Sequence, residues 1–127
     1  MESYLVDETA VFVRPQPAAE VILVKPANAQ EVSAILKMAN DKKIPVFPRG
    51  GGTGLVGGAI PTENGLMLST ERMDEIEIDS ENMVAVAGAG ATLEKLLKKV
   101  EEAGMSFPLH PGSEGAFLGG LVACNAG

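Results

Sequence analysis

The sequence predicts a single domain of α+β or α/β type, with an early βαβ unit followed by strands of mixed direction. Two stretches carry apolar residues at positions i, i+3, i+4 and i+7, which is the stripe of an amphipathic helix. Short apolar or alternating runs lie around them and have the length of strands. The 127 residues, 46% hydrophobic and 21% charged, give an ordinary globular balance with room for one modest core.

The βαβ unit comes first. Val21–Val24 is a continuous apolar run, which favours a strand buried on both faces. Asn28 and Glu31 resemble a capping box, and the helix that they start ends near Lys42, whose charge is favourable at a helix C-terminus. Residues 44–47 then predict the second strand.

The later elements are shorter. Residues 66–68 predict a strand, and residues 75–79 alternate polar and apolar side chains as a half-buried strand does. Residues 83–87 can return as an antiparallel partner of that strand. Thr92 caps a second helix, which Gly104 ends. The remainder of the chain is apolar and rich in glycine, and we assign no element to it.

Charge and composition weigh against several classes of function. A net charge of −7 does not suit nucleic-acid binding, which needs clustered Lys and Arg, and the few aromatic residues do not suit stacking on single strands. One cysteine and one histidine leave no internal disulfide and no multi-histidine metal site. No apolar run approaches the roughly 18 residues of a membrane helix, and the N-terminus has no secretory signal pattern. A cytoplasmic setting is the default expectation.

Glycine clusters in one loop directly after a predicted strand. Within nine residues the chain carries Gly50, Gly51, Gly52, Gly54, Gly57 and Gly58. Successive bare N–H groups can form a concave anion nest, and in so acidic a chain a phosphate must be held mainly by such groups. Arg49 adds a cation and Thr53 a hydroxyl donor. The alternative is a glycine-rich surface turn.

Two other phosphate-binding patterns are incomplete in this sequence. The Walker pattern is absent because no Gly-Lys pair occurs. Residues 52–57 match G-x-G-x-x-G literally, but no helical periodicity follows them, so the helix N-terminus that the dinucleotide fingerprint needs is missing. Gly88 and Gly90 do lie between a strand and a helix, with Leu93 in place of the third glycine. A nicotinamide site there stays open as a minor alternative.

Residues 46–58, Val-Phe-Pro-Arg-Gly-Gly-Gly-Thr-Gly-Leu-Val-Gly-Gly, closely resemble the pyrophosphate-binding loop of FAD-linked oxidases of the vanillyl-alcohol oxidase and p-cresol methylhydroxylase type. Residues 111–113, 118–120 and 125–127 resemble a second motif of that family. The resemblance implies an α+β FAD-binding domain over residues 21–127, preceded by an irregular segment over residues 1–20. Family members continue beyond such a sequence, so we expect a truncated domain without its substrate domain.

The resemblance also implies the cofactor contacts. Pyrophosphate would be wrapped by Pro48, Arg49, Gly50, Gly51, Gly52, Thr53 and Gly54, and Gly57 and Gly58 would let the backbone pass close to FAD. The flavin end would lie near Pro111, Gly112 and Ser113, and the isoalloxazine or ribityl region would border Gly119, Gly120, Ala123 and Asn125. Thr53 stands where members with covalent FAD often carry histidine, so the implied FAD is non-covalent.

Three residues depart from the family pattern. Phe117 stands where Ser or Thr is common, Leu121 where Asn is usual, and His110 where Asp or another residue is expected. We read His110 as structural or solvent-facing and Cys124 as a small buried hydrophobe. No catalytic residue is assigned.

The closest resemblance is to the D-subunit of glycolate oxidase and the D-lactate dehydrogenase group. It implies that a small D-2-hydroxy acid, bound by a missing domain, gives a hydride equivalent to flavin N5, with electrons passing to oxygen, a quinone or a cytochrome. An electron-acceptor subunit and a peripheral membrane association of the full-length protein are consistent with that group. The alternatives are an NADPH-using reductase of the enolpyruvyl-glucosamine type and an inactive or partial FAD-binding module.

Overall fold

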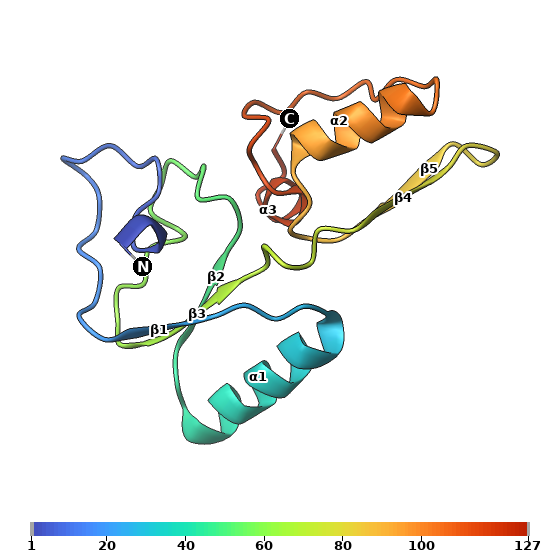
Figure 1. Cartoon of the computed structure of the whole chain (residues 1–127). Coiled ribbons are helices and arrows are strands. Elements are labelled where there is room, and N and C mark those ends of the chain that lie inside the picture. The colour runs from blue at the N-terminus through green and yellow to red at the C-terminus, as the bar shows by residue number, and fades with distance from the viewer. Residues whose placement is uncertain (1, 127) are drawn as a thin grey trace.

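The structure, a computed structural model, describes residues 2–126. Its first unit is a parallel sheet of β1 (Val21–Val24), β2 (Val46–Arg49) and β3 (Gly65–Ser69) in the order β1–β3–β2 (Figure 1). Four successive residues of β3, from 66 to 69, are buried, and Met67 is fully buried. The central strand therefore carries the core of this unit.

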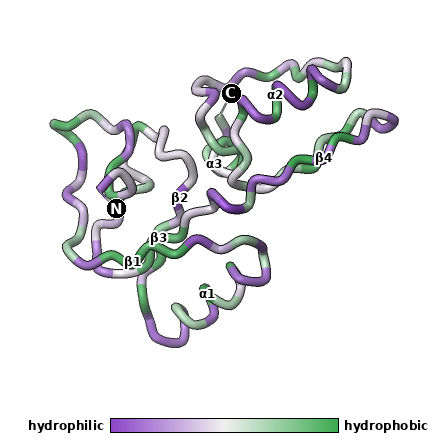
Figure 2. The backbone as a smooth tube through the Cα atoms, viewed as in Figure 1, coloured by the Kyte–Doolittle hydropathy of each residue, from purple (hydrophilic) through white to green (hydrophobic). Residues whose placement is uncertain are grey.

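The prediction that β1 is buried on both faces is wrong. β1 pairs with β3 along one edge, and Ile22 is 65% exposed. Burial on both faces belongs instead to β3, which has a parallel neighbour on each side. Figure 2 shows that hydrophobic residues lie along both β1 and β3.

The second strand begins and ends two residues later than predicted. It runs through Pro48 and Arg49, so these two candidate cofactor residues lie on the strand end and the glycine loop begins at Gly50. Arg49 pairs in register with Ser69 of β3, and its carbonyl accepts the Thr70 N–H at 3.1 Å. This pairing ties the start of the loop to the central strand.

Helix α1 (Ala29–Lys42) joins β1 to β2, as the βαβ prediction requires. The Asn28 side chain accepts the Glu31 N–H at 2.9 Å, which confirms the predicted N-cap. Along its stripe Val32 and Ile35 are half-buried and Ala39 is buried.

The second unit is an antiparallel hairpin with two helices. β4 (Ile76–Asp79) pairs with β5 (Val84–Ala87), and α2 (Leu93–Glu102) packs against β4. A cluster of Ile76, Ala91, Leu96 and Val100 fills the space between them. The predicted mixture of strand directions is thus divided between two separate sheets.

Helix α3 (Leu118–Ala123) was not predicted from the sequence. It has six residues, two of them glycine, and Phe117 at its N-cap supplies no side-chain hydrogen bond. Neither periodicity nor capping could therefore signal it. Cys124, at its C-terminal end, is exposed, so the expectation that it is buried is wrong.

Before β1 the chain holds one 3₁₀ turn, η1 (Glu2–Tyr4), and otherwise follows an irregular path beside the loop that links β2 to β3 (Figure 1). Among residues 2–126, no helix is both long and apolar enough to cross a membrane.

Candidate functional site

The glycine loop leaves β2 at the carboxyl edge of the parallel sheet (Figure 1). Ligands of open parallel sheets bind at this edge, where the connecting loops gather. Gly51 and Gly54 are exposed, and Gly50, Gly52 and Thr53 are half-buried. The loop is therefore reachable from solvent at the place where a ligand is expected.

The backbone of this loop offers a row of free donors. Within residues 2–126, none of the five N–H groups of residues 50–54 donates an intramolecular hydrogen bond. Gly52 adopts a left-handed conformation with φ of 75°, which turns the chain as an anion nest does. Five adjacent unpaired donors fit an anionic group such as a pyrophosphate.

The structure brings the glycine loop against the second motif. A Cβ built on Gly51 would lie 2.7 Å from the Gly115 carbonyl oxygen, and one on Gly50 would lie 3.4 Å from the Phe117 Cβ. The first distance leaves no room for a side chain, and the second is an ordinary van der Waals contact. The glycine loop therefore meets Gly115 and Phe117, which lie between the first two parts of the second motif and more than sixty residues further along the chain.

Arg49 is in the site but its charge is already engaged. It is 8% exposed, its Nη1 donates to the Val6 carbonyl at 2.8 Å, and its Nη2 donates to the Ser3 carbonyl at 3.0 Å. Burial lowers the pKa of its guanidinium, and the nearby Asp7 carboxylate opposes that effect. The cation that the sequence suggested for phosphate thus faces the N-terminal segment.

The remaining loop glycines differ in their surroundings. Gly57 has φ of 74°, and its N–H donates to the Thr9 hydroxyl at 2.6 Å. Gly58 is exposed, with open space around a built Cβ. Only Gly57 is therefore constrained by the fold itself.

The predicted flavin-end residues are more scattered. Pro111 is half-buried, Gly112 and Ser113 are exposed, and no hydrogen bond within residues 2–126 joins these three to the glycine loop. A Cβ on Gly119 would lie 2.7 Å from the Ala89 Cβ, so the packing of α3 already requires a glycine there. Gly120, Ala123 and Asn125 are also exposed, and Asn125 has φ of 50°.

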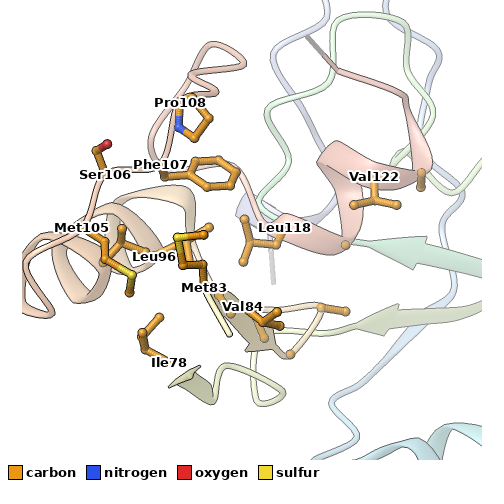
Figure 3. A pocket seen from close by; sticks show the side chains of 17 residues that line it. Ile78, Met83, Val84, Leu96, Met105, Ser106, Phe107, Pro108, Leu118 and Val122 are labelled. Atoms are coloured by element: carbon orange, nitrogen blue, oxygen red, sulfur yellow. The ribbon is translucent and has the colours of Figure 1, made fainter. Parts of the chain in front are cut away.

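An apolar groove of about 1010 Å³ lies in the second unit, between the hairpin, α2 and α3 (Figure 3). Figure 3 shows Met83, Leu96, Phe107 and Leu118 among its lining side chains. It includes the candidate residues Gly119 and Ala123. Among the residues that the structure describes, none of the glycine loop lines it and no lining residue is titratable. The groove therefore offers apolar contact without acid–base chemistry.

At the alternative nicotinamide site, Gly88 and Gly90 pack closely against neighbouring backbone. A Cβ on Gly90 would overlap the Thr70 carbonyl oxygen, so the chain itself fills this approach. The first N–H groups of α2 are also engaged, since Leu93 donates to the Ala116 carbonyl and Glu94 to the Glu114 carbonyl, both at 3.0 Å. A helix N-terminus whose donors are satisfied in this way cannot hold a pyrophosphate.

His110 is exposed, with its Nε2 3.0 Å from the Glu114 Oε1. This pair lies at the surface next to the turn that caps α2. His110 therefore contacts a side chain four residues further along the chain.

Sequence reasoning missed a set of residues in the N-terminal segment. Thr9 and Asp7 are buried beside the glycine loop, and Tyr4 contacts the ends of two strands. These contacts join positions 21 to 67 residues apart, so no local pattern in the sequence could show them.

Comparison with known proteins shows which family the chain belongs to. The family model described as "FAD binding domain" matches residues 20–127. A D-lactate dehydrogenase of Archaeoglobus fulgidus is 56% identical over 126 residues, which are 99% of this chain and 28% of that protein. The glycolate oxidase subunit GlcD of Bacillus subtilis is 37% identical over 107 residues, 83% of this chain and 23% of that protein. A chitooligosaccharide oxidase structure superposes with a TM-score of 0.76 at 20% identity, covering 94% of this chain and 25% of its own.

The family match over residues 20–127 therefore defines an FAD-binding domain, and the fold agrees with that of the structure named a chitooligosaccharide oxidase. The chain belongs to the FAD binding domain family. It spans about a quarter of the length of these curated relatives.

Proposed function

We propose that this chain supplies the FAD pyrophosphate site of a flavin-dependent oxidoreductase that oxidises a small D-2-hydroxy acid. The observation that carries the proposal is the row of five N–H groups in residues 50–54, at the carboxyl edge of the sheet, that have no acceptor within residues 2–126. The names of the relatives supply the substrate class, since one is a D-lactate dehydrogenase and another a glycolate oxidase subunit.

Bound FAD would supply the hydride-accepting chemistry, and this chain would bind and orient it. Residues 50–54 would donate to the pyrophosphate oxygens, and the exposed Gly58 would let the cofactor pass close to the backbone. Gly120, Ala123 and Asn125 would border the flavin side. Thr53 offers a hydroxyl but no nucleophile suited to a stable flavin bond, so FAD would be held non-covalently.

The substrate, the electron acceptor and the catalytic groups belong to the whole protein. We propose a D-2-hydroxy acid as substrate, a separate electron acceptor and a cytoplasmic setting. The single exposed cysteine is consistent with a reducing compartment.

The test begins with the full-length protein. Acid precipitation should release the flavin into the supernatant, because no covalent bond holds it. Dye reduction should then be measured with D-lactate, for which L-lactate is the control, and with the achiral glycolate, for which acetate is the control. Turnover of the D-2-hydroxy acids supports the proposal. NADPH oxidation with an enolpyruvyl sugar nucleotide and no turnover of hydroxy acids would assign the domain to the alternative reductase.

A further inference from the structure

The N-terminal segment, residues 2–15, contacts a residue at or just after the carboxyl end of each strand of the parallel sheet. We call these residues the N-terminal clamp. The FAD binding domain model matches the chain from residue 20 onwards, so the clamp lies outside the matched region. The match to the Archaeoglobus D-lactate dehydrogenase nevertheless covers 99% of this chain.

The clamp is anchored at the sheet through Tyr4. The Tyr4 hydroxyl donates to the Glu71 Oε2 at 2.6 Å and accepts from the Lys25 Nζ at 2.8 Å, and Lys25 pairs with the Glu71 Oε1 at 2.7 Å. Lys25 follows β1 and Glu71 follows β3. The Lys25 ammonium and the Arg49 guanidinium also lie 4.7 Å and 5.6 Å from the centre of the Tyr4 ring.

The clamp also holds the glycine loop at two points. The Glu8 N–H donates to the Gly52 carbonyl at 3.2 Å, and the Gly57 N–H donates to the Thr9 hydroxyl at 2.6 Å. Thr9 is 2% exposed. Because these bonds engage one carbonyl inside the nest and one N–H beyond it, they fix the loop while leaving the donors of residues 50–54 free.

Arg49 links the clamp to the strand that carries the loop. Its two bonds go to clamp carbonyls, and a Cβ on Gly52 would overlap its guanidinium, so the cation lies directly behind the nest. The Asp7 carboxylate is buried beside Gly54, and its Oδ2 has no hydrogen-bond partner within residues 2–126. This negative charge offsets part of the positive charge that Arg49 would present to an anion.

We propose that the N-terminal clamp is the scaffold of the FAD pyrophosphate site, and that Arg49 is a positioning residue that fixes the loop instead of a ligand of the phosphate. This inference rests on the proposed function of the loop. Residues 2–15 then belong to the site, and Arg49 is not one of its phosphate ligands.

The first test uses Thr9→Val in the full-length protein, with Thr62→Val as the matched control. Thr62 is exposed on the same β2–β3 connection. Valine keeps the shape of Thr9 but removes the acceptor for the Gly57 N–H, so FAD affinity, measured by flavin fluorescence in titrations of the apoprotein, should fall about tenfold. The Thr62 variant should bind FAD as the wild type does.

The second test separates positioning from direct ligation, using Arg49→Gln with Lys98→Gln as a charge-matched control on the exposed side of α2. A positioning residue predicts a lower melting temperature of the apoprotein and an FAD affinity reduced by about the same factor at low and high salt. A direct phosphate ligand predicts an unchanged apoprotein melting temperature and a loss of affinity that is large at low salt and small at high salt.

The outcomes distinguish this inference from the proposed function. If the wild type binds no FAD, the proposed function fails and the clamp has no cofactor site to support. If the wild type binds FAD but Thr9→Val binds it equally well, or Arg49→Gln shows the pattern of a direct ligand, the clamp proposal is overturned while the proposed function stands.

Discussion

Replacing Gly52 by alanine tests whether the loop is held in the shape that the structure shows. Gly52 has φ of 75°, where an alanine costs about 1–2 kcal/mol. The new Cβ would also overlap the Arg49 guanidinium, which must then give up part of its bonding to Ser3 and Val6, at a further cost of about 1–3 kcal/mol. The free energy of unfolding of the apoprotein should therefore fall by about 2–5 kcal/mol.

The assay is urea unfolding of the full-length apoprotein, followed by titration with FAD. Gly58→Ala is the matched control, because a Cβ at Gly58 meets open space, and it should leave the stability of the apoprotein within about 0.5 kcal/mol of wild type. If FAD passes close to this position, the control should still weaken FAD binding. A Gly52→Ala apoprotein as stable as the wild type would refute the described loop conformation.

Two further predictions concern the surroundings of the site. Glu71 has a lowered pKa, chiefly because the Lys25 ammonium and the Tyr4 hydroxyl bond to its carboxylate, so its stabilising effect is present above its ordinary pKa and is lost as pH falls through the lower folded value. Glu71→Gln should therefore lower stability at pH 7 and reduce the loss of stability below pH about 4; an unchanged acid unfolding curve would argue against the Tyr4 anchor. Gly119→Ala would place a Cβ 2.7 Å from the Ala89 Cβ, and this overpacking should destabilise the second unit by about 1–3 kcal/mol. If calorimetry shows that the variant is as stable as the wild type, the described packing of α3 is contradicted.

Local sequence patterns correctly predicted the elements that have a clear helix cap or a clear strand alternation. The Asn28 cap of α1, the Thr92 cap of α2 and the β4–β5 hairpin are confirmed, because each depends on residues a few positions apart. The family resemblance is also confirmed, because the glycine motifs are dense and ordered along the chain.

Features that depend on distant contacts could not be predicted in this way. Ile22 is 65% exposed on the edge strand β1, which an apolar run alone does not reveal. Arg49 looked like a phosphate ligand from its position beside the glycines, whereas its partners Ser3 and Val6 lie 46 and 43 residues earlier. The roles of Tyr4 and Thr9 escape sequence reasoning for the same reason.

The most direct test of the central claim is amide hydrogen exchange over residues 50–54 of the full-length protein, with and without FAD. These N–H groups have no acceptor within the described chain, so they should exchange rapidly in the apoprotein. If they hold the pyrophosphate, saturation with FAD should slow their exchange by about tenfold or more. A tenfold slowing corresponds to a rise of about 1.4 kcal/mol in the free energy of opening these N–H groups to exchange. FAD saturation that leaves exchange at residues 50–54 unchanged would contradict the claim.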